Sequence, residues 1–133
     1  MIRHLTVPVE GQGLHDITPA CRAQVRDVRE GLCTLFLQHT SASLLIQENY
    51  DPSARHDLEA WLNRLVPEND PLYTHTLVGP DDMPAHIKAA LTATSLAIPV
   101  IDGDLALGTW QGVFLWEHRH ARGDRRVILH VAD

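Results

Sequence analysis

The chain of 133 residues carries a formal net charge of -6 at pH 7, and 44% of its residues are hydrophobic. This length predicts one domain, residues 1–133, and it excludes a (β/α)₈ barrel, which needs roughly 200 residues or more. The negative charge argues against nucleic acid as a partner, because nucleic-acid binding depends on cationic patches that neutralise phosphates.

Two strands and a helix are predicted in the first third of the chain. Residues 2–9 and 13–18 alternate between apolar and polar side chains, as strands with one buried face do. From Thr18 onward the apolar residues recur at helical spacing, and we expect this helix to end at Gly31.

The two cysteines, Cys21 and Cys33, fall on this helix and on the apolar strand that follows it. Both positions are predicted to be buried, so we expect two reduced thiols and no disulfide. The longest apolar runs are too short to cross a membrane, and the N-terminus lacks the apolar segment of a signal peptide. We therefore expect a cytoplasmic protein with no membrane partner.

The middle of the chain alternates between strands and amphipathic helices. Residues 32–38 are apolar at successive positions, which predicts a strand covered on both faces. A second strand around residues 44–48 leads into a helix over residues 52–66, which has one apolar stripe. A loop over residues 68–80, with at most a short strand within it, precedes another helix that starts at Asp81.

The last third is predicted to form three strands, over residues 96–101, 108–119 and 125–131. The middle one has bulky side chains on both faces, and one short chain can hardly cover both, so we expect subunits to pack sheet to sheet. The predicted fold is α+β, a compact sandwich-like domain of mainly antiparallel sheet with about three helices.

The first group of candidate functional residues flanks the strand over residues 44–48. His39 and Ser41 end the preceding apolar strand, and a histidine there suits a metal ligand, a general base or a phosphate contact. We expect the polar residues after the strand to return to the same neighbourhood; they are Glu48, Asn49 and Asp51. The alternative is a turn stabilised by hydrogen bonds from its hydroxyls to the backbone.

The second group opens the helix at Asp81, where Asp82, His86 and Lys88 follow. Sets of Asp and His of this kind bind divalent metals, whereas adjacent acids at a helix start can serve only as caps and dipole partners. The third group lies along the strand over residues 108–119. Glycines flank Trp110, which suits the close approach of a flat ligand or of a neighbouring backbone, and the alternative is structural packing; Gln111 and Glu117 lie on the same strand.

Longer motifs in the chain closely resemble those of the YjbQ family. They are H-T-S-A at residues 39–42, E-N-Y-D-P at 48–52, R-H-D at 55–57, D-D-M-P-A-H-I-K at 81–88 and G-T-W-Q-G at 108–112. The resemblance implies a compact α+β fold, a homotrimer and the family label of secondary thiamine-phosphate synthase. That reaction joins a pyrimidine methyl pyrophosphate to a thiazole phosphate, a transfer that needs a divalent metal and cations on the leaving group.

The resemblance, taken with the three groups, implies a set of roles at one site. The expected catalytic residues are His39, Glu48, Asp51 and His86. The expected contacts to a small phosphorylated metabolite are Ser41, Asn49, Arg55, Lys88, Trp110, Gln111 and Arg126. A divalent metal, zinc or magnesium, would be bound by His39, His86, Asp82 and Glu117. The alternative function is a metal- or anion-binding trimer, or a hydrolase of another phosphorylated metabolite.

Overall fold

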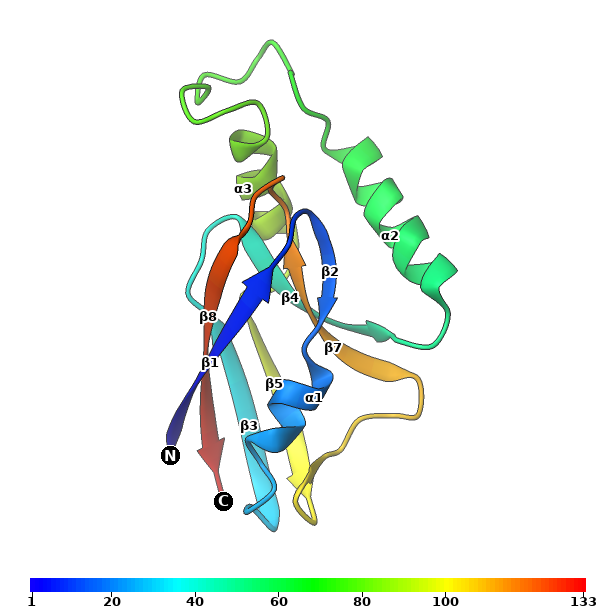
Figure 1. Ribbon diagram of the computed structural model, residues 1–133, viewed down its shortest axis with the longest axis vertical. Coiled ribbons are helices and arrows are strands. Elements are labelled where there is room, and N and C mark those ends of the chain that lie inside the picture. The colour runs from blue at the N-terminus through cyan, green and yellow to red at the C-terminus, as the bar shows by residue number, and fades with distance from the viewer.

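Two antiparallel sheets and three helices make up the structure, a computed structural model that describes residues 1–133 (Figure 1). The first sheet has the strand order β1 (Ile2–Val9), β8 (Gly123–Ala132), β3 (Glu30–Leu37), β5 (Ser95–Ile101) and β6 (Asp104–Leu105). The second has the order β2 (Gly13–Asp16), β7 (Gln111–Glu117) and β4 (Ala42–Glu48). The helices are α1 (Thr18–Ala23), α2 (Pro52–Leu65) and α3 (Asp82–Leu91). The predicted α+β class is confirmed.

The main core lies between the two sheets, because alternate residues of each strand point to one face. On β3 the inward residues are Cys33, Leu35 and Leu37, and they pack with Leu44 of β4 and Leu115 of β7. This cluster contains 19 buried residues from both sheets and α1, so it holds the sandwich together.

A second, smaller core covers the other face of β7. Phe114 and Trp116 point away from the main core and pack with Leu62 and Val66, which lie on α2 and at its C-terminal end. Both faces of β7 are therefore covered within one chain. The expectation that a second subunit must cover this strand is wrong, because α2 crosses over the second sheet.

The outer face of the first sheet is where cover is missing. Leu32 and Phe36 on β3 point away from the core, and they are 43% and 50% exposed. The sequence predicted that residues 32–38 are buried on both faces. Within one chain, only the inner face of β3 is buried.

Helix α1 is shorter than predicted: it ends at Ala23, and Gly31 lies within β3. After Ala23 the amides of Val25 and Val28 bond to carbonyls three residues earlier, so tight turns replace the helix while both side chains stay buried. Helical spacing alone does not separate these two conformations over so few residues.

The predicted state of the cysteines is confirmed: Cys21 and Cys33 are both free and buried. Burial raises the pKa of the Cys21 thiol to about 12. None of the helices is long and apolar enough to cross a membrane.

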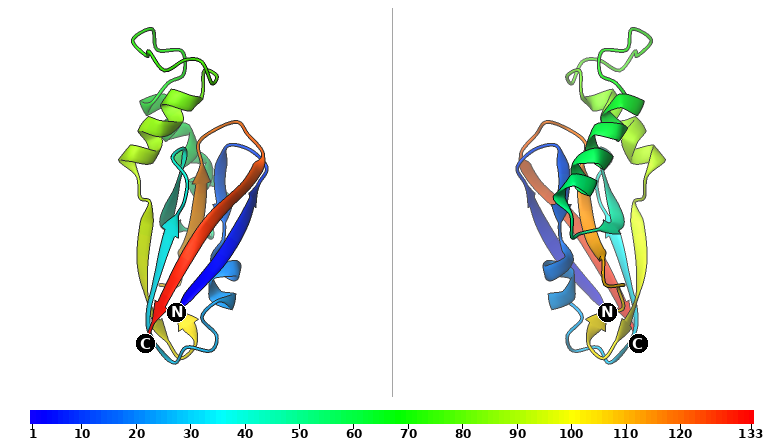
Figure 2. Two further views of the ribbon diagram at one scale, coloured as in Figure 1. Left: turned by 90° about the vertical axis from the view of Figure 1, so that its left-hand side faces the viewer. Right: turned by 90° about the vertical axis from the view of Figure 1, so that its right-hand side faces the viewer.

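Helix α3 and the loop over residues 66–81 lie at the opposite end of the molecule from the two termini (Figure 2). The loop contains no strand, as its Pro and Gly content predicts. Beneath it the C-terminal end of β7 meets the N-terminal end of β4, since Glu117 pairs with Ala42. Many of the candidate functional residues gather at this end.

Candidate metal centre

Helix α3 presents two metal-ligating side chains on one face. Asp82 and His86 are four residues apart, so they lie one above the other on the helix surface. Neither acid at the start of α3 serves as a cap: the N-cap Asp81 makes no side-chain capping hydrogen bond. Its carboxylate instead accepts from the Arg119 side chain at 3.2 Å and from the His120 amide at 2.9 Å. Capping therefore does not explain these acids, whereas Asp82, in the first turn of α3, does lie where the helix dipole favours a negative charge.

The third member of the cluster is His75, from the loop that precedes α3. Its Nε2 lies 2.7 Å from Asp82 Oδ2, and Nε2 of His86 lies 3.0 Å from the same oxygen. One ligand atom from each of the three residues falls within 4.8 Å of the others. His75 was not among the residues picked from the sequence, because it sits in a loop with no periodic pattern to place it.

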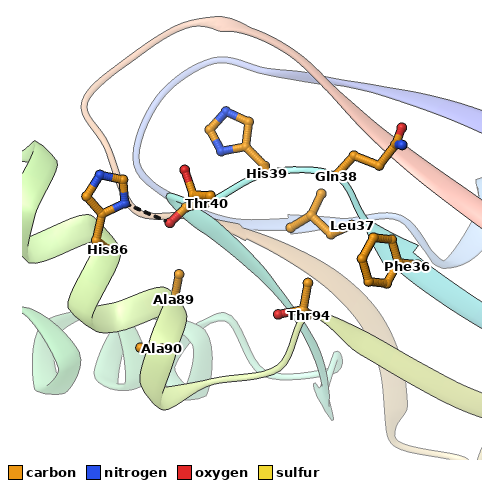
Figure 3. A pocket seen from close by; sticks show the side chains of 9 residues that line it. All are labelled: Phe36, Leu37, Gln38, His39, Thr40, His86, Ala89, Ala90 and Thr94. Carbon is orange, nitrogen blue, oxygen red and sulfur yellow. Dashed lines mark hydrogen bonds between the residues drawn. The ribbon is translucent and has the colours of Figure 1, made fainter.

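The hydrogen bonding of His86 fixes which ring nitrogen is free. Nδ1 lies 3.0 Å from the backbone oxygen of Thr40, which only accepts, so Nδ1 carries the proton and donates (Figure 3). In the neutral ring Nε2 then holds a lone pair that faces the Asp82 carboxylate. The His86 Nε2 lone pair and the Asp82 carboxylate oxygen are then two acceptors only 3.0 Å apart. Such a contact requires either a second proton on the ring or a cation that binds both atoms.

Asp82 is held in its ionised form by its neighbours. Burial works against ionisation, but the hydrogen bond from His75 and the charges of His86 and Arg119 outweigh it, so the pKa of Asp82 lies below its ordinary value. Arg119 Nη1 lies 3.3 Å from the second carboxylate oxygen, Oδ1. Arg119 also donates to the backbone oxygen of Val78 at 2.7 Å, which ties the loop to β7's C-terminal end. These contacts are of the kind that orient ligands around a metal.

A cavity of about 850 Å³ opens beside His86, and Phe36, Leu37, Ala89 and Ala90 are its apolar lining residues (Figure 3). His39 lines it, with the rings of His39 and His86 on either side of Thr40. The amide of Ser41 donates to Nδ1 of His39 at 3.1 Å, so the neutral ring carries its proton on Nε2. Burial, followed by the positive charge of Arg125, lowers the pKa of His39 and favours this neutral form. His39 adjoins the metal cluster without belonging to it.

A buried polar layer supports this end of the sandwich. Glu117 is fully buried and accepts from Nε of Arg125 at 2.5 Å and from the backbone of Arg119 at 3.1 Å. Glu117 was expected to bind the metal, but it is not among the clustered ligands. Lys88 is buried as well, and its ammonium donates to Asn63 Oδ1 at 2.5 Å, so in this structure it bonds within the chain.

The remaining residues of the first group lie at the other end of β4. Ala42 pairs with Glu117, whereas Glu48 pairs with Gln111. Seven strand residues span about 20 Å, so Glu48 and the residues after it do not return to His39. Asp51 caps α2, where its Oδ1 accepts from the Ser53 amide at 2.9 Å.

Trp110 and Asn49 also lie at this far end. Trp110 packs edge-on against Tyr50 with ring centroids 4.9 Å apart, and Asn49 donates its backbone amide to Trp110. Of the two remaining arginines, Arg55 lies on α2 and Arg126 on β8, both outside the metal cluster. Within one chain, the site expected from the sequence is thus divided between two ends of the molecule.

Comparison with known proteins confirms the family resemblance. The family described as "UPF0047 protein YjbQ-like" matches residues 3–133. The UPF0047 protein sll1880 of Synechocystis is 52% identical, over 96% of this chain and 88% of the relative. The UPF0047 protein YjbQ of Escherichia coli O157:H7 is 47% identical, over 93% of this chain and 91% of the relative.

Solved structures agree with the fold. The conserved hypothetical protein TT1486 of Thermus thermophilus superposes with a TM-score of 0.89 at 35% identity, covering 98% of this chain and 99% of the other. An uncharacterised YjbQ/UPF0047 protein of Clostridium acetobutylicum gives a TM-score of 0.84 at 32% identity, with 99% of both chains covered.

The prediction that this chain is a thiamine-phosphate synthase, which the resemblance implied, is wrong. The matching family and the curated relatives are described only as UPF0047 proteins and the Clostridium acetobutylicum structure as uncharacterised, and none carries the label of a thiamine-phosphate synthase. They give no better support to the alternative, a binding trimer or phosphate-metabolite hydrolase. The geometry agrees with this correction, because the stacking residue Trp110 and the acid Asp82 lie toward opposite ends of β7.

Proposed function

Because the chain belongs to the YjbQ-like UPF0047 family, whose description names no activity, we propose its function from its own side chains: it binds a divalent metal ion through His75, Asp82 and His86. The observation that carries this proposal is the contact between Nε2 of His86 and the Asp82 carboxylate. Since Nδ1 of His86 is committed to Thr40, a metal ion would satisfy both acceptors at once.

The donor set favours zinc over magnesium. Two imidazole nitrogens and one carboxylate oxygen suit zinc and its neighbours in the transition series, whereas magnesium prefers oxygen ligands. Three protein ligands also leave a coordination position open, as in catalytic and unlike structural zinc sites. At such a position zinc acts as an electrophile and activates water at neutral pH.

The residues around the cluster fit an enzymatic role for the metal. His39 would present its Nε2 proton as a hydrogen-bond donor beside the metal, because its Nδ1 accepts from Ser41. Apolar side chains, among them Leu37 and Ala89, line the rest of the adjoining cavity. We therefore propose a metal-dependent enzyme whose substrate is small and partly apolar.

Metal analysis of the purified protein tests the proposal. We expect about one zinc per chain, and isothermal titration of the metal-free protein should show one high-affinity site. His75→Ala and His86→Ala should each weaken zinc binding at least about 100-fold, since each removes a direct ligand. His56→Ala is the matched control, because His56 is an exposed histidine on α2 that lies outside the cluster. Full zinc affinity in both cluster variants would overturn the proposal.

We also propose that three copies associate through the outer face of the first sheet. The support is the exposed apolar surface over β3 and β5, to which Leu32, Phe36 and Ile101 contribute, together with the trimer that the family resemblance implies. Light scattering should give a mass of about three chains at micromolar concentration. Phe36→Lys should dissociate the assembly, and Tyr50→Lys, at an exposed aromatic outside this sheet, should not. A monomeric wild-type protein would refute this assembly.

A further inference from the structure

A second cavity, of about 430 Å³, lies between the edge strands β1 and β2, beside α1 and α2. We call it the Arg55 cavity. Its walls are mainly apolar, with Leu5 and Val7 from β1 and Leu14 and Ile17 from β2 and the residue after it. The volume and lining fall in the range of pockets that take small organic molecules.

Arg55 supplies the positive charge of this cavity, and no group in the chain pairs with it by a hydrogen bond or a salt bridge. Its guanidinium makes no hydrogen bond and no ion pair, and its Nε is shut away from solvent. It lies over the ring of Phe114, with Cζ 4.9 Å from the ring centroid. A cation–π contact attracts the charge but leaves the five N–H donors of the guanidinium unused. The buried Nε–H is a donor without a partner, which costs free energy unless a bound group satisfies it, while the half-buried Nη groups are the ones that a ligand entering the cavity would meet.

The other polar groups of the cavity are already engaged. Asp16 Oδ1 accepts from the Thr18 amide at 2.9 Å, and Nε2 of His15 lies 2.9 Å from the Gly11 carbonyl. Glu59, one turn along α2, makes no close ion pair with Arg55; burial raises the pKa of Glu59, and the charge of Arg55 is the first effect that opposes this. Arg55 is thus the one group in the cavity that offers several free donors in a planar fork.

From these contacts we infer that the Arg55 cavity binds a small monocarboxylate with an apolar tail. The guanidinium fork matches the two oxygens of a carboxylate, and the walls of the cavity would bury the tail. Arg55 and Asp16 on the same lining carry opposite charges, so a bound monocarboxylate leaves the cavity with one net negative charge and a phosphate dianion leaves it with two. The carboxylate is therefore favoured over a phosphate.

This site is separate from the proposed metal centre. None of its lining residues lines the cavity beside His86, and Arg55 lies in the first turn of α2, next to Phe114 in the middle of β7. Loss of zinc binding would therefore leave the carboxylate site intact, and the two proposals fail independently.

The test is calorimetric titration of the full chain with octanoate, octanol and octyl phosphate. Octanoate should bind, and octanol should bind at least about 10-fold more weakly, because it lacks the charge that Arg55 pairs with. Arg55→Gln should cut octanoate affinity by about 10-fold or more on the same grounds. Arg64→Gln, at an exposed arginine on the same helix, and His86→Ala should leave octanoate affinity unchanged.

Methyl NMR of the wild-type protein locates the site even if Arg55→Gln fails to fold. Octanoate should shift the methyl resonances of Leu5, Val7 and Leu14 and leave those of Ala89, in the other cavity, in place. The inference is overturned if octanoate does not bind, if Arg55→Gln folds and binds it equally well, or if the shifts appear elsewhere. Tighter binding of octyl phosphate than of octanoate would also overturn it.

Discussion

The two ends of strand β7 both carry polar residues, but these residues have different surroundings. At the C-terminal end Glu117 is fully buried and hydrogen-bonded, and Arg119 reaches the carboxylates at the start of α3. At the N-terminal end the Gln111 side chain accepts only from the nearby Gly108 amide, and Trp110 remains 57% exposed. The same strand therefore delivers one set of polar groups into a packed layer and the other to solvent.

What separates the two ends is the element that covers each. Helix α3 and the loop that carries His75 lie over the C-terminal end, where they exclude water and bring opposite charges together. No helix lies over the N-terminal end, which meets only the turn into α2. Polar residues at a strand end thus form a candidate site only where a second element converges on them.

Among the polar residues at the two ends of β7, the largest effect on stability should come from Glu117→Gln. This change leaves Arg125 buried beside a neutral amide in place of its carboxylate, and breaking a buried ion pair costs about 3–5 kcal/mol. Urea denaturation measures the loss. Glu10→Gln is the control, since Glu10 and Arg122 form an exposed pair at 3.8 Å whose loss should cost less than about 1 kcal/mol. If both variants lose the same free energy of unfolding, burial does not strengthen the contribution of the Glu117–Arg125 pair.

A pH dependence should come from His118 at the same end. Burial, with a smaller effect of Lys88, lowers the pKa of His118 from 6.5 to about 3, and its Nε2 lies 2.9 Å from Ser43 Oγ. As pH falls below 6.5 the unfolded chain takes up the proton first, so this group favours unfolding increasingly toward pH 3. Between pH 7 and 4.5 the loss should reach roughly 2–3 kcal/mol.

His118→Gln checks the origin of that pH dependence. Glutamine keeps a polar atom near Ser43 and does not titrate, so the variant should lose less stability than the wild type over the same pH range. The measurement is urea denaturation at intervals between pH 7 and 4.5 for both proteins. Parallel pH profiles would show that other groups, such as the carboxylates near α3, account for the whole effect.

The sequence predicted most elements of the fold. At the candidate site it predicted the pairing of Asp82 with His86 but missed the third ligand, His75. The spacing of apolar residues located α2 and the strands, and the motif at residues 81–88 correctly placed Asp82 and His86 together on a helix. His75 was missed because the loop that carries it has no period from which its position follows. The distance between His39 and Glu48 was missed for another reason: closeness in sequence across an extended strand still means separation in space.

Asp51→Ala should have a modest effect confined to the exposed end. Asp51 caps α2, where both the amide and the hydroxyl of Ser53 donate to its Oδ1, and these bonds lower the pKa of the carboxyl. Losing an N-cap should lower the melting temperature by about 2–6 °C, and zinc affinity should not change. Asp51→Asn, which keeps an acceptor oxygen, should recover most of the loss. A weaker zinc affinity in Asp51→Ala would mean that the two ends of β4 communicate.

The smallest effect is expected for Trp110→Ala. The indole is more than half exposed, and its edge-on contact with Tyr50 is the one aromatic contact it makes, so the loss of stability should not exceed about 1 kcal/mol. Zinc affinity should stay within about twofold of the wild type, because the strand register puts Gln111 opposite Glu48, at the far end of β4 from Ala42. Trp116→Ala supplies the contrast, since that indole is buried against α2 and its loss should cost about 3–5 kcal/mol. If Trp110→Ala instead weakens zinc binding while leaving stability unchanged, the exposed end of β7 must reach a metal centre through a second copy of the chain.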